Sequence, residues 1–133
     1  MLLINVRNLS PITRFEVEKY INNLNVNKAT NSSCPHVKFL KLSVQIISPV
    51  ISKIFNKCIN EGIFPSSLKT AEIIPIYKKG NKLTASNYRP ISLLPPLSKV
   101  FERHIHNTLS KFIDKHKILH QFQYGFRNFV LLK

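Results

Sequence analysis

Two short segments, residues 71–77 and 88–94, constrain the fold most strongly, because they are rich in β-branched residues and have the length of strands. The first contains Pro75, which cannot donate to a central ladder and therefore indicates an edge strand. A basic turn at 78–82 follows it. The pattern predicts a β-hairpin whose tip and return strand carry four cations: Lys78, Lys79, Lys82 and Arg89.

The residues before the hairpin begin with a helix-start signal. Thr13 and Glu16 have the spacing of a capping box, in which each side chain satisfies a backbone donor near the other. Ile12 and Val17 flank it as a hydrophobic staple. Apolar residues then recur at helical spacing, which predicts a helix over 14–24.

Two longer stretches also show the helical period. The first predicts two helices, or one kinked helix, over 37–61, with Ser48 as an N-cap, Pro49 at the first helical position and Gly62 at the end. The second predicts an amphipathic helix over 97–115. We therefore predict an α+β fold in one domain, with helices around a β-hairpin.

The charge balance points to a polyanionic partner. Twenty Lys and Arg face six acidic residues, giving a formal net charge of +14 and a pI near 10.1. Such an excess predicts electrostatic binding of RNA or DNA; an anionic membrane surface and a ribosomal-type protein are the alternatives. Without a membrane span, a signal peptide or a cysteine framework, we expect an intracellular protein, cytoplasmic or nuclear and not secreted.

Metal-binding chemistry has few candidate residues. Asp114 is the single aspartate among the six acids. His116 and His120 have helical metal-ligand spacing, but no cysteine or carboxylate completes the set, so surface histidines are the preferred interpretation. We predict no metal site.

Ordered motifs over 61–127 resemble the reverse transcriptases of non-LTR retrotransposons, of the LINE and jockey type. The motifs are Phe64-Pro65, Lys69-Thr70-Ala71, Pro-Ile-Tyr-Lys-Lys-Gly at 75–80, Asn-Tyr-Arg-Pro-Ile-Ser-Leu-Leu at 87–94, Ser-Lys-Val-Phe-Glu-Arg at 98–103 and Gln-Phe-Gln-Tyr-Gly-Phe-Arg at 121–127. Over 10–61 the resemblance is weaker, and Asn31, Ser33 and Leu68 depart from the family pattern. The resemblance implies an N-terminal fingers-region fragment: an irregular lead-in at 1–12, a fingers-like region at 13–127 and a divergent tail at 128–133.

The resemblance also assigns candidate site residues. It implies that Lys78, Lys79 and Arg89 contact the phosphates of the incoming nucleotide and the template, and the donor chemistry of Arg and Lys suits phosphate. The alternative is that they are solvated charges on a turn. Tyr88 would stack on a base or sugar, or pack as a core aromatic. The resemblance also implies that a third group lies beside the template path: Gly125, Phe126 and Arg127. The alternative is a turn with a core Phe and a surface Arg.

Catalysis in the family implied by the resemblance uses two metal ions held by Asp residues of a palm region. We expect that palm to be absent from this chain, which leaves no catalytic residues and no cofactor; Mg²⁺ is implied only for an intact polymerase. The missing palm is a possible partner. The expected function is thus a fragment of an RNA-directed DNA polymerase from a mobile element, inactive alone. The alternatives are a short basic RNA- or DNA-binding protein without catalysis, or a non-functional translated relic.

Overall fold

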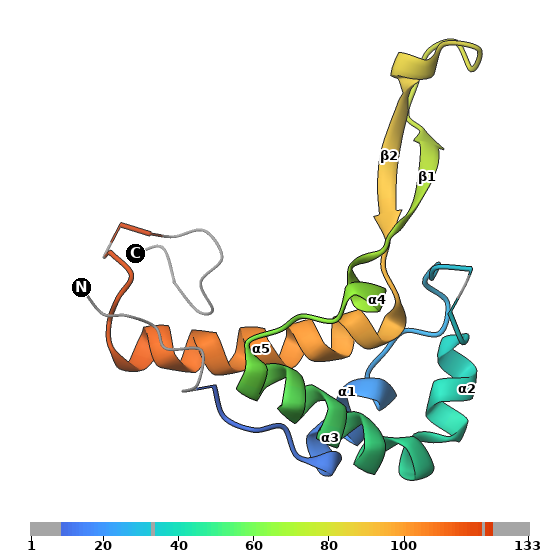
Figure 1. The fold of residues 1–133 in the computed structure, drawn as a ribbon. Coiled ribbons are helices and arrows are strands. Elements are labelled where there is room, and N and C mark those ends of the chain that lie inside the picture. The colour runs from blue at the N-terminus through green and yellow to red at the C-terminus, as the bar shows by residue number, and fades with distance from the viewer. Residues whose placement is uncertain (1–8, 33, 121, 124–133) are drawn as a thin grey trace.

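The computed structural model describes residues 9–32, 34–120, 122 and 123. Its elements follow in the order α1 (Arg14–Asn22), α2 (Val37–Leu42), α3 (Val44–Glu61), α4 (Ser66–Lys69), β1 (Glu72–Tyr77), η2 (Ala85–Asn87), β2 (Tyr88–Leu93) and α5 (Pro96–Lys115). The helices form a body, and the two strands form an antiparallel hairpin that extends away from it (Figure 1). The predicted α+β content is confirmed. Both strands lie within their predicted ranges.

The start of α1 follows the predicted signal. The backbone N–H of Glu16 donates to Thr13 Oγ1 at 3.2 Å, and the N–H of Thr13 donates to Glu16 Oε2 at 2.8 Å. Ile12 and Val17 are both buried in the same cluster, as a hydrophobic staple requires. Asn56 of α3 holds the chain just before α1. Its side chain accepts from the N–H of Ile12 at 2.7 Å and donates to the carbonyl of Ile12 at 2.9 Å.

The predicted N-cap at Ser48 is wrong. The break between α2 and α3 lies at Ser43, so Pro49 falls inside α3. Ser48 has another role: it is fully buried, and its hydroxyl donates to Glu18 Oε1 of α1 at 3.0 Å. The predicted end of α3 is confirmed, because Gly62 adopts a left-handed φ of 67°.

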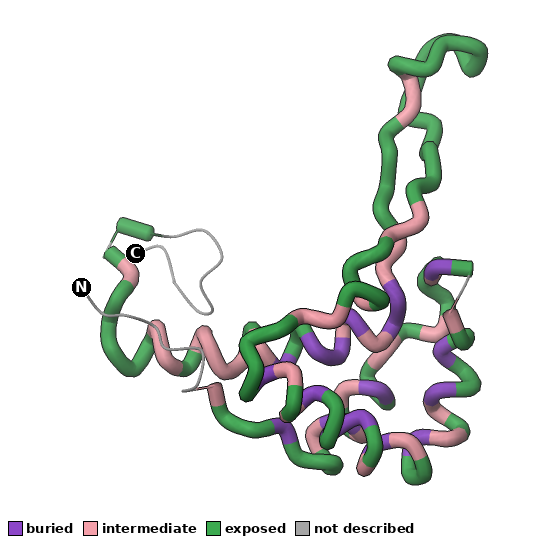
Figure 2. The backbone as a smooth tube through the Cα atoms, viewed as in Figure 1, coloured by how far each residue is buried: buried purple, intermediate pink, exposed green. Residues whose placement is uncertain are grey.

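The core lies where α1, α3 and α5 meet, and buried segments gather there (Figure 2). Phe101 of α5 is its central aromatic residue. Its ring stacks on Phe55 with centroids 4.5 Å apart and meets Phe64 at 5.2 Å. The buried cluster comprises Ile12, Val17, Ile21, Leu40, Val44, Ile51, Phe55, Ile59, Val100 and Phe101.

The hairpin does not share this core, so the expectation that helices surround it is wrong. Ile73 is 66% exposed and Ile76 is 49% exposed, although both are β-branched residues in mid-strand. The buried cluster is formed by the helices and the segments beside them, and it includes no described residue of either strand. The hairpin therefore joins the body only at its base and presents both faces to solvent (Figures 1 and 2).

The base of the hairpin is held by the loop between α1 and α2. The backbone N–H of Ser32 donates to Glu72 Oε2 at 2.8 Å. This hydrogen bond, together with one from the Ser32 side chain, lowers the pKa of Glu72 below its ordinary range. Within the described part of the chain, no helix combines the length and the apolar composition needed to cross a membrane.

Candidate nucleic-acid interface

The loop at the outer end of the hairpin, residues 78–87, has a defined internal hydrogen-bond pattern. The N–H of Lys78 donates to the carbonyl of Asn87 at 2.8 Å, which extends the ladder beyond the strands. The side chain of Asn87 donates across the loop to the carbonyl of Asn81 at 2.8 Å, and Asn81 Oδ1 accepts from the N–H of Leu83 at 2.9 Å. These hydrogen bonds across the loop restrict its backbone to one conformation.

Two tyrosines support this loop from the strand ends. Tyr77 and Tyr88 are directly opposite in the register, and their rings meet edge to face with centroids 5.7 Å apart. The hydroxyl of Tyr77 donates to the carbonyl of Gly80, and that of Tyr88 donates to the carbonyl of Lys82 at 2.9 Å. Tyr88 thus lies outside the helical core, against Tyr77. The sequence interpretation missed this support, although aromatic residues on both sides of the basic turn were a readable signal.

Gly80 is the one loop position that excludes a side chain. Its φ is +94°, and a Cβ there would lie 2.8 Å from Asn87 Nδ2. The close approach of Asn87 therefore depends on glycine.

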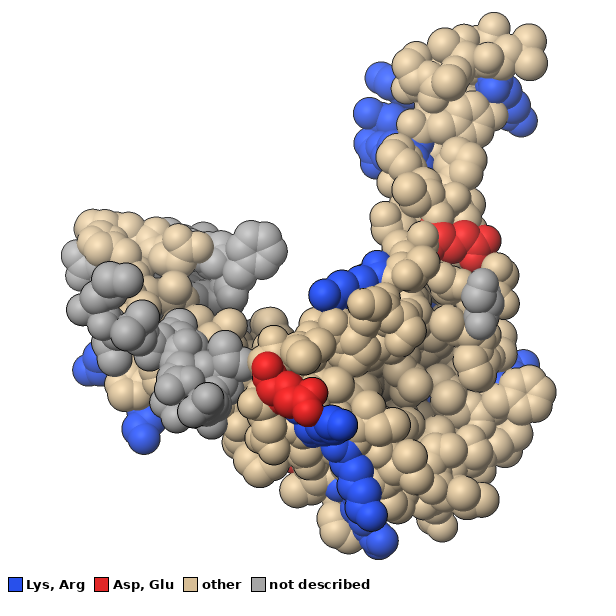
Figure 3. Space-filling view, in the orientation of Figure 1, with Lys and Arg blue, Asp and Glu red and all other residues tan. Residues whose placement is uncertain are grey.

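The predicted phosphate-binding residues are exposed at this outer end. Lys78 and Lys79 lie in the loop, and Arg89 lies on β2 opposite Ile76. Figure 3 shows basic side chains gathered near the outer end of the hairpin, while the visible acidic side chains lie nearer the body. Over the described ranges, the ion pair found joins Lys57 to Glu61 on α3, so these three cations are not neutralised by a carboxylate. Lys82 lies 5.7 Å above the Tyr77 ring, in a cation–π contact.

The two prolines of the hairpin face each other in the register, Pro75 opposite Pro90. Ladder pairs alternate between hydrogen-bonded and non-bonded, and the bond from Lys78 to Asn87 sets the phase. Counting from it, the proline pair is non-bonded, so the missing N–H groups would have pointed outward. The prolines therefore leave the hairpin ladder intact and remove a donor that an additional strand would use on either edge.

The acidic side chains are dispersed and engaged. Four of the six accept a hydrogen bond from a separate partner: Glu16 from Thr13, Glu18 from Ser48, Glu72 from Ser32 and Glu102 from Ser98. Glu61 lies 3.9 Å from Lys57 in an exposed ion pair. Asp114, the single aspartate, is exposed near the end of α5. No group of three potential metal ligands occurs among the described residues. These carboxylates do not fit the ligand set of a two-metal Mg²⁺ centre.

Several other residues singled out in the sequence do not belong to this interface. Gly125, Phe126 and Arg127, the predicted template-path residues, lie outside the described residues, as does the tail at 128–133. His116 and His120 both follow the end of α5 at Lys115, so they do not share one helical face.

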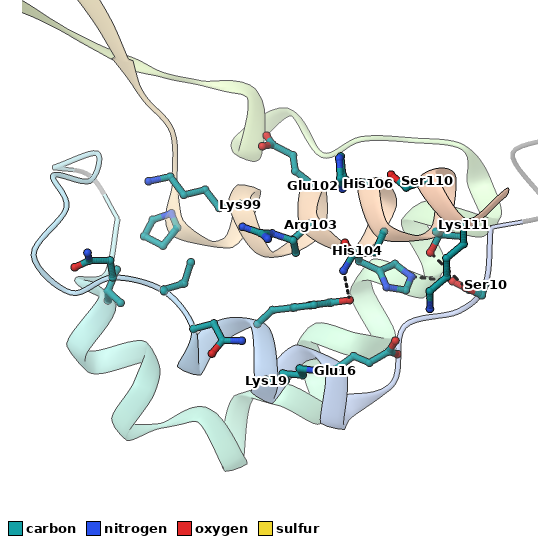
Figure 4. A pocket seen from close by; sticks show the side chains of 18 of the residues that line it. Ser10, Glu16, Lys19, Lys99, Glu102, Arg103, His104, His106, Ser110 and Lys111 are labelled. Carbon is teal, nitrogen blue, oxygen red and sulfur yellow. Dashed lines mark hydrogen bonds between the residues drawn. The ribbon is translucent and has the colours of Figure 1, made fainter. Parts of the chain in front are cut away.

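A cleft of ≈ 1100 Å³ lies between α1 and α5 (Figure 4). Its floor is polar: Nε2 of the buried His104 is 2.8 Å from the carbonyl of Ser10, and Asn107 donates to the hydroxyl of Tyr20 at 3.1 Å. Burial acts to raise the pKa of Glu16 at the rim. The hydrogen bonds from Thr13 and the coulombic effects of His104 and Lys111 outweigh it, so the pKa is lowered.

Curated proteins of mobile elements match most of this chain. It is 38% identical over 120 residues to the RNA-directed DNA polymerase from mobile element jockey of Drosophila melanogaster, an alignment that covers 90% of the chain and 13% of the relative. It is 34% identical over 118 residues to the corresponding jockey protein of Drosophila funebris, covering 88% and 13%. The probable RNA-directed DNA polymerase from transposon X-element of Drosophila melanogaster is 35% identical over 121 residues, covering 88% and 13%. No family model matches the chain.

The proteins that match this chain form one class, the RNA-directed DNA polymerases of mobile elements. Within that class the chain belongs to the jockey-type, non-LTR family, and it spans 13% of the length of these curated relatives. The resemblance predicted from the ordered motifs is confirmed.

Proposed function

We propose that this chain is the fingers-like part of a mobile-element RNA-directed DNA polymerase, and that the outer end of its hairpin binds the phosphates of template and nucleotide. One observation carries the proposal: Lys78 and Lys79 of the loop and Arg89 of β2 are exposed, and no carboxylate of the described residues pairs with them. Because the backbone of the loop is already ordered, only the side chains lose conformational freedom on binding, which favours contact with a polyanion.

The chemistry of each cation matches a phosphate contact. Arg89 offers a planar guanidinium that can bond two phosphate oxygens, and it projects from a strand. Lys78 and Lys79 supply mobile point charges in the loop. Backbone contacts of this kind position a nucleic acid without reading its sequence. The binding should therefore be sequence-tolerant and should weaken as salt is raised.

The test compares two triple variants with the same change in net charge. Lys78→Gln/Lys79→Gln/Arg89→Gln removes the hairpin cations. The control removes three exposed lysines of α2 and α3: Lys38→Gln/Lys53→Gln/Lys57→Gln. Both lose equal long-range attraction, so a difference reports local contact. In fluorescence anisotropy with labelled single-stranded RNA, the hairpin variant should bind at least roughly tenfold more weakly than the control, as expected for one lost charge-assisted bond of about 1.5 kcal/mol. Equal affinities would refute the proposal.

We further propose that the 133-residue polypeptide has no polymerase activity by itself. Its carboxylates are dispersed over α1, α3, β1 and α5, and most are engaged elsewhere. Primer extension on an RNA template with Mg²⁺ or Mn²⁺ should give no product above a protein-free control. Measurable extension would show that this account of the carboxylates is wrong.

A second candidate function is a basic nucleic-acid-binding protein without catalysis, which the +14 charge and the dispersed carboxylates also favour. A chimera separates the two. In it, this chain replaces the matching segment of the jockey polymerase of Drosophila melanogaster. Extension by the chimera, lost in the version with the hairpin triple variant, supports the polymerase role. An inactive chimera that still binds RNA favours the binding protein.

A further inference from the structure

A row of polar residues runs along one side of α5. Lys99, Arg103, Asn107 and Lys111 are spaced at intervals of four, so they form one ridge on the helix surface. At a rise of 1.5 Å per residue, the ridge is about 18 Å long. Three of its four members are cations.

Two further cations face this ridge across the cleft between α1 and α5. Lys19 belongs to α1, and Lys28 lies in the loop after it. Figure 4 shows Lys99, Arg103 and Lys111 along α5, with Lys19 on α1 below them. The same cleft is therefore lined by cations from three separate segments of the chain, a placement that nothing in the local sequence requires.

The acidic residues of the cleft offset the charge of these cations only in part, through the electrostatic interaction of Glu16 with Lys111. Five Lys and Arg line it against three acids. The Glu16 carboxylate is directed into the capping box of α1, and that of Glu102 accepts from Ser98 at 2.7 Å. No ion pair joins a cleft cation to a carboxylate in the part of the chain that the structure describes. The cleft thus presents an excess of positive charge to a ligand.

The walls of the cleft are fixed by polar contacts between distant segments. His104 is 2% exposed, and its Nε2 lies 2.8 Å from the carbonyl of Ser10. Asn107, a member of the ridge, donates to Tyr20 of α1. These contacts join α5 to α1 and to the segment before it, so the distance across the cleft is set before any ligand binds.

We propose that this cleft binds the phosphate backbone of a single nucleic-acid strand, as a second site beside the hairpin. A ridge of about 18 Å can meet several consecutive phosphates. Proteins that bind single strands without sequence preference do so with a positively charged groove that follows one backbone, and the cations of this cleft form such a groove. α5 begins at Pro96, shortly after β2 ends at Leu93, so this helix runs from the base of the hairpin along the body (Figure 1). This site does not depend on whether the hairpin binds phosphates.

The test uses the variant Lys99→Gln/Arg103→Gln/Lys111→Gln. Its control is Lys38→Gln/Lys53→Gln/Lys57→Gln, which has the same net charge and lies outside the cleft. The probes are labelled single-stranded RNA of mixed sequence and a duplex of the same sequence. The cleft variant should bind the single strand at least roughly tenfold more weakly than the control, and its salt slope should be smaller by about three. Its affinity for the duplex should match that of the control.

Two outcomes would overturn the proposal. They are equal single-strand affinities in the two folded variants and an equal loss of duplex affinity. If circular dichroism shows the triple variant to be unfolded, exposed Arg103→Gln against exposed Lys53→Gln gives the same comparison with one charge. A loss confined to the hairpin variant would overturn the cleft proposal while leaving the hairpin proposal standing.

Discussion

The body and the hairpin of this chain differ in how much of their apolar surface they bury. In the body, α1, α3 and α5 bury Val17, Ile21 and Val100 completely. In the hairpin, β-branched residues of the same kind stay exposed, and Ile73 keeps 66% of its surface in solvent. Burial of apolar surface is the main driving force for folding. The comparison therefore assigns stability to the body, and it leaves the hairpin as a projecting element whose side chains are available to a partner.

The largest contrast is expected between a core and a hairpin truncation. Phe101→Ala removes the ring that stacks on Phe55, and it should lower the free energy of unfolding by about 3–5 kcal/mol. Ile76→Ala, on the exposed face of β1, should change it by no more than about 0.5 kcal/mol. Urea denaturation followed by circular dichroism measures both. Comparable losses in the two variants would mean that the hairpin belongs to the cooperative core.

Two asparagines give a matched comparison of intermediate size. Asn56→Ala removes both hydrogen bonds that fix the backbone of Ile12, and it should cost about 1–3 kcal/mol in the free energy of unfolding. Asn87→Ala removes a bond that is local to the hairpin loop, so the global free energy should stay within about 0.5 kcal/mol. The same urea series applies. A larger loss for Asn87→Ala than for Asn56→Ala would reverse the assignment of stability.

A subtler difference concerns the edges of the hairpin. Pro75→Val/Pro90→Val restores one outward N–H on each strand and keeps the register. Since the faces are already apolar, the variant should self-associate at concentrations where the unmodified chain does not. Sedimentation velocity at rising concentration measures this. Pro11→Val/Pro35→Val, at exposed positions of the body, is the control. Identical sedimentation of both variants would show that the prolines do not protect the edges.

The smallest effects are expected from two carboxylates with lowered pKa values, Glu16 in the body and Glu72 at the hairpin base. A carboxyl whose folded pKa lies below its unfolded value stabilises the fold above the unfolded pKa, and this stability is lost as pH falls through the folded pKa. The loss should therefore appear below the ordinary glutamate pKa of about 4.3. NMR titration of the side-chain carbons should give both pKa values below that value. Ordinary values would contradict the hydrogen bonds from Thr13 and Ser32.

Local signals explain what the sequence could predict. Thr13 and Glu16 lie within one helical turn, so their capping box is readable without knowing the fold. The same holds for Gly62 at the end of α3 and for the strands that flank the basic turn. Ser48 shows the limit of such signals. Before a proline it has the local features of an N-cap, but its hydroxyl is used by Glu18 of another helix, and that contact depends on tertiary packing.

The candidate sites divide in the same way. The cations of the hairpin are adjacent in the sequence, so their clustering was predictable, whereas their roles remain a proposal. The cleft cations were not predictable as a group, because Lys19 and Lys28 meet α5 only after the body has packed. The four-residue spacing of Lys99, Arg103, Asn107 and Lys111 was a readable signal for a single ridge, but not for the wall that faces it.

The central claim is that the hairpin binds nucleic acid and that the body supplies the stability of the fold. The salt dependence of RNA binding by the hairpin triple variant tests the first part most directly. Each lost phosphate contact lowers the magnitude of the salt slope by about one. Lys78→Gln/Lys79→Gln/Arg89→Gln should therefore lower it by about three relative to Lys38→Gln/Lys53→Gln/Lys57→Gln, while the thermal midpoints of the two variants agree. Equal slopes in the two folded variants would contradict the account.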